Sequence, residues 1–154
     1  VRIGASGKLI QAFDIAKALA LGADWANSAR GYMFAIGCIQ AQACHTNHCP
    51  VGVATQDPLR QRALDVDDKW QRVARFHRNT LSALGEMTGA AGLDHPSEFL
   101  PHHLLMREKD RDMVTGEEVY RYLPDGFLLR GETDDFGYAM RWDRARAETF
   151  APIG

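Results

Sequence analysis

Two strand–loop–helix units follow one another in the first 37 residues, and this succession limits the possible folds more than any other feature. Val1 and Ile3 are apolar, and residues 1–3 predict a short strand, which the Gly-Ala-Ser-Gly turn of residues 4–7 ends. Apolar side chains then recur at helical spacing from Leu9 to Ala20, which predicts an amphipathic helix. Gly22 is suited to end that helix in a left-handed conformation.

The second unit repeats the first with shorter segments. Residues 23–27 predict a buried strand, residues 28–31 its loop, and residues 32–36 the beginning of another apolar helix. Such short links join parallel strands into a βαβ unit. Two parallel strands are not stable alone, because both faces of a parallel sheet have to be covered.

The later sequence offers only one or two further short strands, between residues 119 and 129. We therefore predict an α/β fold in which this chain forms the carboxyl-terminal portion, the last two βα units, of a TIM (β/α)8 barrel. Barrels of this kind typically have about 250 residues, so we expect the other strands to lie upstream. The sequence begins at Val1 without an initiator Met, which leads to the same expectation.

A long amphipathic helix is predicted after the barrel units, over residues 58–92. Asp67 or Asp68 is suited to be an N-cap within it and would split it in two. Gly89 and Gly92 would end it.

Residues 96–100 predict one more helical turn, after which the sequence becomes charged and irregular. We expect residues 1–106 to form the end of the barrel domain, including a loop at residues 38–58. Residues 107–154 would form a peripheral carboxyl-terminal tail.

Composition and charge exclude several classes of protein. The net charge is −2, and the arginines are spread among almost as many acids, which does not favour a nucleic-acid partner. No apolar run approaches the roughly 20 residues needed to span a bilayer, and no signal peptide precedes the first strand. We expect a cytoplasmic protein.

Three cysteines, Cys38, Cys44 and Cys49, lie within twelve residues, and none follows in the remaining 105. A secreted disulfide framework would spread an even number along the chain, so this cluster points to a metal or redox site. Thiolates are soft ligands, and three on one irregular loop can converge on one metal centre. Pro50, directly after the last cysteine, sets a rigid turn. The pattern favours an iron–sulfur site.

Other interpretations of the cysteines stay open. His45 or His48 could complete a tetrahedral zinc site, although the spacing is marginal and His48 is adjacent to Cys49. A single cysteine could be a nucleophile on a barrel loop. All three could also be small buried apolar residues.

Two glycine-containing loops at the predicted strand ends indicate a phosphate site. In a (β/α)8 barrel, phosphate groups commonly bind the loops after strands seven and eight, where helix starts expose backbone N–H groups. The alternative is that the glycines only make tight turns. The candidate cofactor-binding residues are Ser6, Gly7, Lys8, Ala29, Arg30 and Gly31.

Three further residues are expected to be structural. Trp25 and Trp70 are interpreted as core or packing residues. His77 lies between two nearby arginines in the long helix and is expected on its polar face.

The segment from Gly4 to Pro58 resembles the synthase domain of glutamate synthase, and more closely the stand-alone FMN-binding glutamate synthase-like proteins. The resemblance is carried by GASGKL, DIAKALALGAD, NSARG and GCIQAQACHTNHCPVGVATQDP. It is dense over roughly the first 60 residues, looser as far as His103, and slight beyond residue 107.

The resemblance implies a barrel oxidoreductase acting on CH–NH2 donors, with FMN and a [3Fe–4S] cluster. Such an enzyme reduces 2-iminoglutarate, formed from 2-oxoglutarate and glutamine-derived ammonia, to L-glutamate. Cys38, Cys44 and Cys49 fall on the family's cluster ligands. A three-thiolate site leaves one cube corner unfilled, which fits the odd cysteine count.

The resemblance also places Gly7 and the turn at Ala29, Arg30 and Gly31 on the family's phosphate-binding loops. Lys8 stands where some members have a second glycine, and Arg30 stands where they have a small polar residue. Backbone contacts to phosphate survive such changes.

No catalytic residue is identified, and the regions that bind the flavin ring and the substrate are expected upstream. We therefore expect no activity from these 154 residues alone. A small-molecule substrate and an electron-donor protein or subunit are the expected partners. The alternatives are a zinc-stabilised binding module, or a phosphate-binding barrel enzyme of the IMP dehydrogenase type with one catalytic cysteine.

Overall fold

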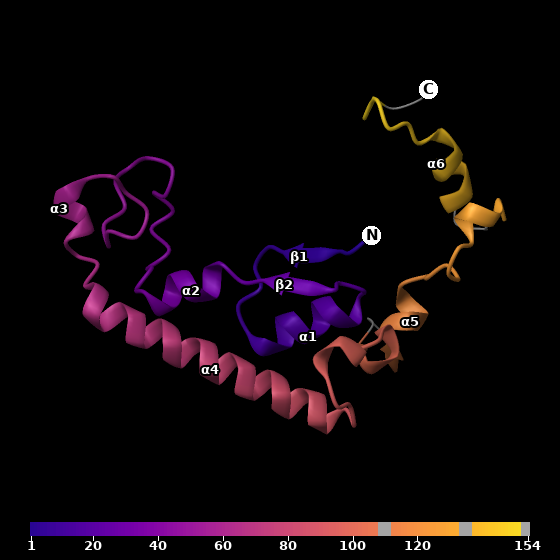
Figure 1. The fold of residues 1–154 in the computed structure, drawn as a ribbon, viewed down its shortest axis with the longest axis horizontal. Coiled ribbons are helices and arrows are strands. Elements are labelled where there is room, and N and C mark those ends of the chain that lie inside the picture. The colour runs from indigo at the N-terminus through magenta and orange to yellow at the C-terminus, as the bar shows by residue number, and fades with distance from the viewer. Residues whose placement is uncertain (108–111, 133–136, 152–154) are drawn as a thin grey trace. The chain divides into compact units, whose positions relative to one another are not determined.

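The structure, a computed structural model, describes residues 1–107, 112–132 and 137–151 (Figure 1). The chain divides into two compact units, Val1–Tyr120 and Arg121–Gly154. The first unit contains a mixed α/β arrangement with few strands.

Strands β1 (Gly4–Ser6) and β2 (Trp25–Asn27) pair in parallel, with Gly4 opposite Trp25. Helix α1 (Ala12–Ala20) connects them, which confirms the predicted βαβ unit. The first strand was predicted three residues too early. A side chain at Gly4 would lie 2.5 Å from the Trp25 indole, so this glycine serves strand pairing and is not in a turn.

Helix α1 begins three residues later than its apolar pattern indicates. The Asp14 carboxylate accepts hydrogen bonds from the backbone N–H groups of Ile10 and Gln11, each at 3.0 Å. The Gln11 bond and then the Ile10 bond lower the pKa of Asp14, and nearby Lys17 adds a smaller effect in the same direction. Gly22 has φ +105°, as predicted for the left-handed end of this helix.

Helix α2 (Arg30–Ala35) leads to the cysteines, and helices α3 (Pro58–Gln61) and α4 (Val66–Ala90) follow them. The predicted break in the long helix is confirmed. The cap is Asp65 instead of Asp67 or Asp68, because the Asp65 carboxylate accepts from the backbone N–H groups of both. Gly92 has φ +76° just beyond α4, whereas Gly89 lies inside it.

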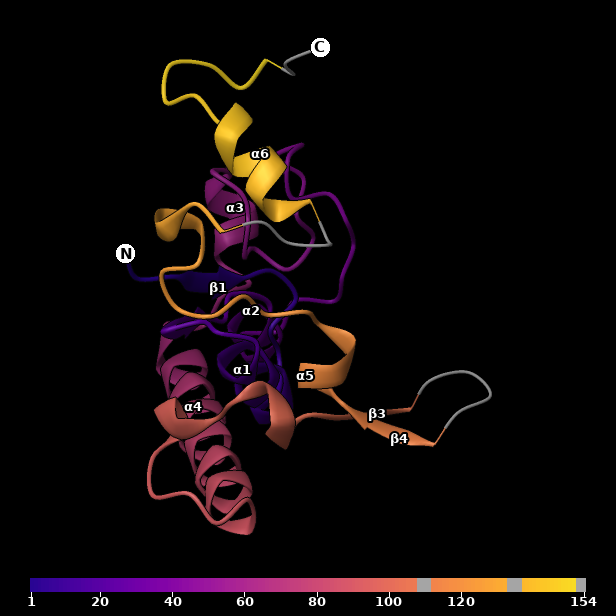
Figure 2. The same ribbon diagram turned by 90° about the vertical axis from the view of Figure 1, so that its right-hand side faces the viewer.

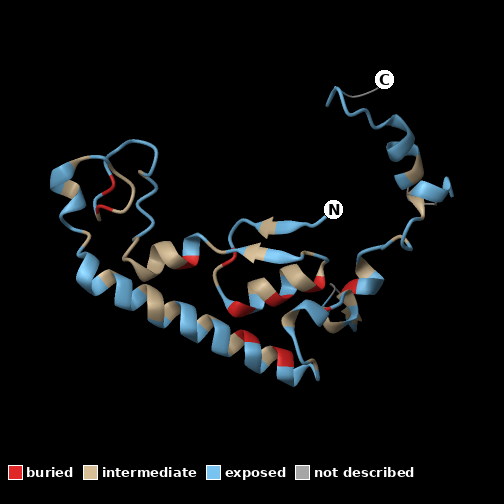
Figure 3. Cartoon of the chain, viewed as in Figure 1, coloured by how far each residue is buried: buried red, intermediate tan, exposed pale blue. Residues whose placement is uncertain are grey.

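The core is small and lies where α1 packs against the carboxyl-terminal half of α4 and the segment after it (Figure 3). Alanines on α1 allow the two helices to approach closely. The buried core residues are Ala12, Ala16, Ala20, Leu84, Phe99 and Leu104.

Neither tryptophan that was interpreted as a core or packing residue is in the core, although Trp25 packs against Gly4. Trp25 is 46% exposed and Trp70 is 60% exposed. On β1 and β2 only the middle residue of each strand is even half-buried. The parallel pair therefore shows little of the two-sided cover that such strands normally have.

The segment after α4 contains η1 (Pro96–Glu98), which confirms the predicted helical turn, and η2 (Pro101–His103). Strands β3 (Leu105–Arg107) and β4 (Met113–Thr115) form an antiparallel pair, and α5 (Gly116–Val119) follows (Figure 2).

The strands predicted between residues 119 and 129 are absent from that segment, all of which the structure describes. The Thr115 hydroxyl accepts from the Glu118 N–H, while the Glu118 carboxylate accepts from Thr115, and this pair of bonds starts a helical turn. The bonds that the Glu118 carboxylate accepts from the backbone N–H and the hydroxyl of Thr115 lower its pKa.

The second unit contains η3 (Leu128–Arg130) and α6 (Tyr138–Arg144). The Arg130 guanidinium donates to the Asp125 carbonyl at 2.7 Å and pairs with Glu132. Among the described residues of both units, no helix is long and apolar enough to cross a membrane.

Candidate cofactor and metal site

The first strand-end loop, residues 7–11, turns sharply out of β1. Gly7 has φ +104° and Lys8 has φ +58°, so two consecutive residues are left-handed. For a residue with a side chain, this conformation costs roughly 1–2 kcal/mol. Lys8 therefore occupies a position that glycine would adopt without strain. Ser6, Gly7 and Lys8 are all exposed.

The second strand-end loop, residues 28–29, joins β2 to α2. The Ser28 hydroxyl donates to the Leu9 carbonyl at 2.7 Å and ties the two strand-end loops together. Ala29 and Arg30 are exposed at the start of α2. The predicted residues of both loops thus lie beside the ends of two paired strands. The Ser28 bond joins the two loops, and sequence reasoning misses it.

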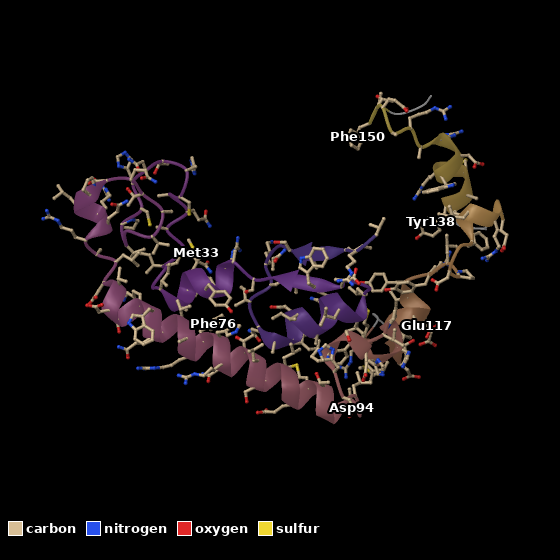
Figure 4. The ribbon with its side chains drawn as sticks, in the orientation of Figure 1. Met33, Phe76, Asp94, Glu117, Tyr138 and Phe150 are labelled. Carbon is tan, nitrogen blue, oxygen red and sulfur yellow. The ribbon has the colours of Figure 1, made fainter. Side chains whose placement is uncertain are left out.

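Gly31, a candidate cofactor-binding residue, also has a packing role. It is buried, and a β-carbon there would lie 2.7 Å from the Phe76 ring and 3.0 Å from the Ile10 carbonyl oxygen. Figure 4 shows Phe76 on α4, the helix that runs beside α2. The glycine allows α4 to approach the strand-end loops closely.

Tyr32 makes a second link between α2 and α4. Its ring meets Phe76 edge-on at a centroid distance of 5.2 Å, and its hydroxyl is hydrogen-bonded to His77 Nδ1 at 2.5 Å. His77 is exposed, as predicted, yet it holds α2 in place. No sequence pattern pairs two residues that are 45 positions apart.

The cysteine loop, residues 38–57, begins directly after α2. The Cys38 N–H donates to the Met33 carbonyl at 2.9 Å. Gln40 and Gln42 have φ values of +57° and +54°, which turn the chain back toward α2. Cys38 is half-buried and Cys44 is exposed.

A hollow of about 310 Å³ brings the second strand-end loop and the cysteine loop together. Ala29 and Arg30 line it on one side, and Cys38 and Cys44 line it on the other. Its other lining residues are Met33, Phe34, Gln40 and Gln42. Two of the three predicted ligands therefore share a surface with two of the predicted phosphate-loop residues.

Cys49 lies in a different environment and does not line that hollow. Its side chain is 6% exposed. Hydrogen bonds from the backbone N–H of Ala54 first and of Val51 second lower the pKa of the Cys49 thiol, with smaller effects from Val53 and Gly52. These bonds stabilise the thiolate and outweigh the opposing effect of desolvation.

Sequence reasoning alone misses Asn47 and Thr55, which close the second half of the cysteine loop. Asn47 Oδ1 accepts from the Gln56 N–H at 2.5 Å, and the Thr55 hydroxyl donates to the Asn47 carbonyl at 2.7 Å. Asn47 has φ +65°. Asparagine tolerates this conformation better than most residues, and that tolerance is the only available sequence signal.

The donor chemistry fits a cluster held by thiolates, because three free thiols occupy one short loop. Their sulfurs are not gathered: within the described ranges, no three His, Cys, Asp or Glu residues are placed to hold a metal ion. His45 and His48 are both exposed. Uniting the three sulfurs therefore requires part of the cysteine loop to rearrange.

Positive charge is available at both strand-end loops. In the part of the chain that the structure describes, neither Lys8 nor Arg30 forms an ion pair. Their charges are therefore free to attract an anion.

Comparisons with known proteins agree on one family. Residues 1–94 match the family model described as a conserved region in glutamate synthase. The glutamate synthase large subunit-like protein YerD of Bacillus subtilis is 46% identical over 114 residues, which cover 74% of this chain and 22% of that protein. No solved structure matches the chain.

Other relatives extend the same picture. The archaeal glutamate synthase (NADPH) of Methanocaldococcus jannaschii is 36% identical over 94 residues, covering 61% of this chain and 18% of that protein. The glutamate synthase (NADPH) large chain of Bacillus subtilis is 34% identical over 130 residues, which cover 78% of this chain and 8% of that protein. The chain thus spans about a fifth or less of the length of these three relatives.

Proposed function

The chain belongs to the glutamate synthase family, and from that premise we propose that it supplies the iron–sulfur loop and the phosphate end of a flavin site. The observation that carries the proposal is the hollow at the end of α2. Ala29 and Arg30 line it together with Cys38 and Cys44. A cluster ligated here would lie beside a flavin phosphate held at the start of α2.

Cys38, Cys44 and Cys49 are the proposed ligands of a [3Fe–4S] cluster. Three thiolates suit a cluster that lacks one iron, because the vacant corner needs no fourth ligand. The N–H groups around the Cys49 sulfur support this role, since such bonds stabilise thiolate and tune cluster potential.

The proposed FMN phosphate ligands are the backbone N–H groups of the two strand-end loops. A phosphate there would gain from exposed N–H donors and from the charges of Lys8 and Arg30. The Ser28 bond to Leu9 holds the two loops in register, so both can face one anion. The full proposed set is Ser6, Gly7, Lys8, Ala29, Arg30 and Gly31.

When bound, the cluster and FMN would supply the electrons that reduce 2-iminoglutarate, formed from 2-oxoglutarate and glutamine-derived ammonia, to L-glutamate. This chain's own part is to hold the cluster and the phosphate. An electron-donor protein or subunit would serve the cluster. The residues that bind the substrate would lie in the parts of the longer relatives that this chain does not match.

The exposed parallel strands support a larger barrel. Ile3 is 59% exposed and Trp25 is 46% exposed beside strands that normally have cover on both faces. We propose that β1 and β2 with their helices are the last two βα units of a (β/α)8 barrel, whose other strands would cover them. The family match ends at residue 94, which supports a peripheral role for residues 107–154.

Metal analysis of the chain purified without oxygen tests this proposal. We expect iron and acid-labile sulfide in a ratio close to 3:4, as a [3Fe–4S] cluster requires. One zinc per chain with no sulfide would overturn it and favour a zinc-stabilised module. Turnover by these 154 residues alone would contradict the proposed division of labour.

A further inference from the structure

We propose that Asn47 and Thr55 are positioning residues that form a latch, which closes residues 47–56 into a ring around Cys49 before any cluster binds. This inference rests on the proposed function, because it makes Cys49 the fixed anchor of the cluster. Cys38 and Cys44 would then adapt to the cluster from the other half of the loop.

The latch fastens the ring at two points. Asn47 Oδ1 accepts from the Gln56 N–H at 2.5 Å and lies 3.1 Å from the Thr55 hydroxyl. That hydroxyl donates to the Asn47 carbonyl at 2.7 Å. One asparagine side chain and one threonine hydroxyl therefore join backbone positions that are eight or nine residues apart.

Helix α3 holds the ring from outside. Arg60 donates to the His48 carbonyl at 3.3 Å, and the Gln61 side chain donates to the Thr55 carbonyl at 2.9 Å. Gly52 has φ +74°, and a β-carbon there would lie 2.4 Å from the Arg60 carbonyl oxygen. The ring and the helix are thus packed backbone against backbone.

The closed ring explains the environment of Cys49. Cys49 lies within the ring and is 6% exposed, and the Gly52 N–H donates to the Cys49 carbonyl at 3.4 Å. Without the latch, only the two bonds from α3 would hold His48 and Thr55, so we expect the ring to open more often and to expose Cys49.

The first half of the cysteine loop has no comparable bonds. Within the described residues, the hydrogen bonds of positions 38–46 join partners at most five positions apart, such as Thr46 with the Ala43 carbonyl. This half can therefore rearrange at low cost, whereas the half that contains Cys49 is already formed.

Two substitutions at Asn47 separate the side-chain bond from the backbone conformation. Asn47→Gly keeps the left-handed backbone without strain and removes the acceptor. Asn47→Asp keeps an acceptor oxygen in the same place. Gln56→Ala is the matched control, because only the backbone of Gln56 belongs to the latch.

The first readout is amide hydrogen exchange at residues 51–54 in the reduced, metal-free full chain. We expect exchange to be faster by about tenfold or more in Asn47→Gly, because the Gln56 N–H loses its acceptor and only the Thr55 bond to the backbone carbonyl of residue 47 remains. Asn47→Asp and Gln56→Ala should stay close to the natural chain. Equal exchange in Asn47→Gly and the natural chain would overturn the latch.

The second readout is the chain loaded with iron and sulfide. Asn47→Gly should change the electron paramagnetic resonance spectrum and the midpoint potential of the cluster, and Asn47→Asp should restore the spectrum. An unchanged spectrum and potential in Asn47→Gly would overturn the positioning role while leaving the proposed function intact. No iron uptake by the natural chain would instead overturn the proposed function. The exchange experiment would still decide whether the latch exists, because it uses the metal-free chain.

A second pair of variants covers the case in which Asn47→Gly does not fold. Thr55→Val removes the hydroxyl at nearly constant volume, and Thr55→Ser retains it. We expect Thr55→Val to speed exchange at residues 51–54 and Thr55→Ser to leave it unchanged. The same exchange rate in both variants would contradict the latch.

Discussion

The second strand-end loop and the cysteine loop meet at one hollow, yet different forces shape the strand-end loops and the cysteine loop. The strand-end loops are placed by packing. Gly31 leaves room for the Phe76 ring, and the paired strands fix where each loop begins. The cysteine loop contains no helix or strand before α3, and side-chain hydrogen bonds close its second half. One edge of the site is therefore as rigid as the fold, whereas the other depends on a few polar residues.

This difference predicts a wide range of local stability in the reduced, metal-free chain. Amides of the α1 core, such as those of Ala16 and Ala20, should exchange more slowly than those of residues 40–46 by about a thousandfold or more, because core elements open only with global unfolding. Hydrogen exchange followed by mass spectrometry measures both. Similar exchange rates in the two regions would contradict the claim that the packed region is more stable than the cysteine loop.

Gly31→Ala tests whether packing places the second strand-end loop. The new methyl group would lie too close to the Phe76 ring and the Ile10 carbonyl oxygen, so we expect a loss of about 1–3 kcal/mol in the free energy of unfolding.

Thermal or urea unfolding measures the effect of Gly31→Ala. Adding Phe76→Leu should recover part of the loss, since the ring edge is the nearest clashing group. No loss in the single variant would show that α4 can move away from the loop freely.

Asp14→Asn tests the bonds that shape the first strand-end loop. The folded state lowers the pKa of Asp14, so its contribution is present at neutral pH and lost as pH falls below about 4. We expect the variant to lose about 1 kcal/mol at pH 7 and to converge with the natural chain in acid. Urea unfolding at several pH values is the measurement, and a constant difference across pH would contradict this cause.

Lys8→Gly should have the smallest effect and the opposite sign. Relief of the left-handed conformation favours the folded state, while the freer unfolded chain offsets part of the gain, so we expect a stabilisation of up to about 1 kcal/mol. Thermal unfolding measures it. A clear destabilisation would mean that the lysine side chain contributes to the fold.

Much of the packed region was predictable, because helical periodicity and glycine positions indicate where its elements begin and end. The βαβ unit, the left-handed Gly22 and the break before α4 all followed from the sequence. The strand register did not: β1 contains only three residues, and what fixes it is the contact between Gly4 and Trp25. A contact between residues 21 positions apart leaves no local pattern.

The candidate site was predictable as a set of residues but not as an arrangement. The spacing of Cys38, Cys44 and Cys49 indicated shared ligands, yet the structure sets Cys49 apart from the other two. Asn47 and Thr55 are ordinary loop residues in the sequence. Their importance lies in hydrogen bonds that only the folded loop reveals.

The central claim is that all three cysteines hold one cluster across this divided loop. Electron paramagnetic resonance of the oxidised chain, purified without oxygen, tests it most directly. We predict the signal of one [3Fe–4S] cluster per chain, and its loss in each of Cys38→Ser, Cys44→Ser and Cys49→Ser. A signal that persists in any one of the three variants would contradict the account.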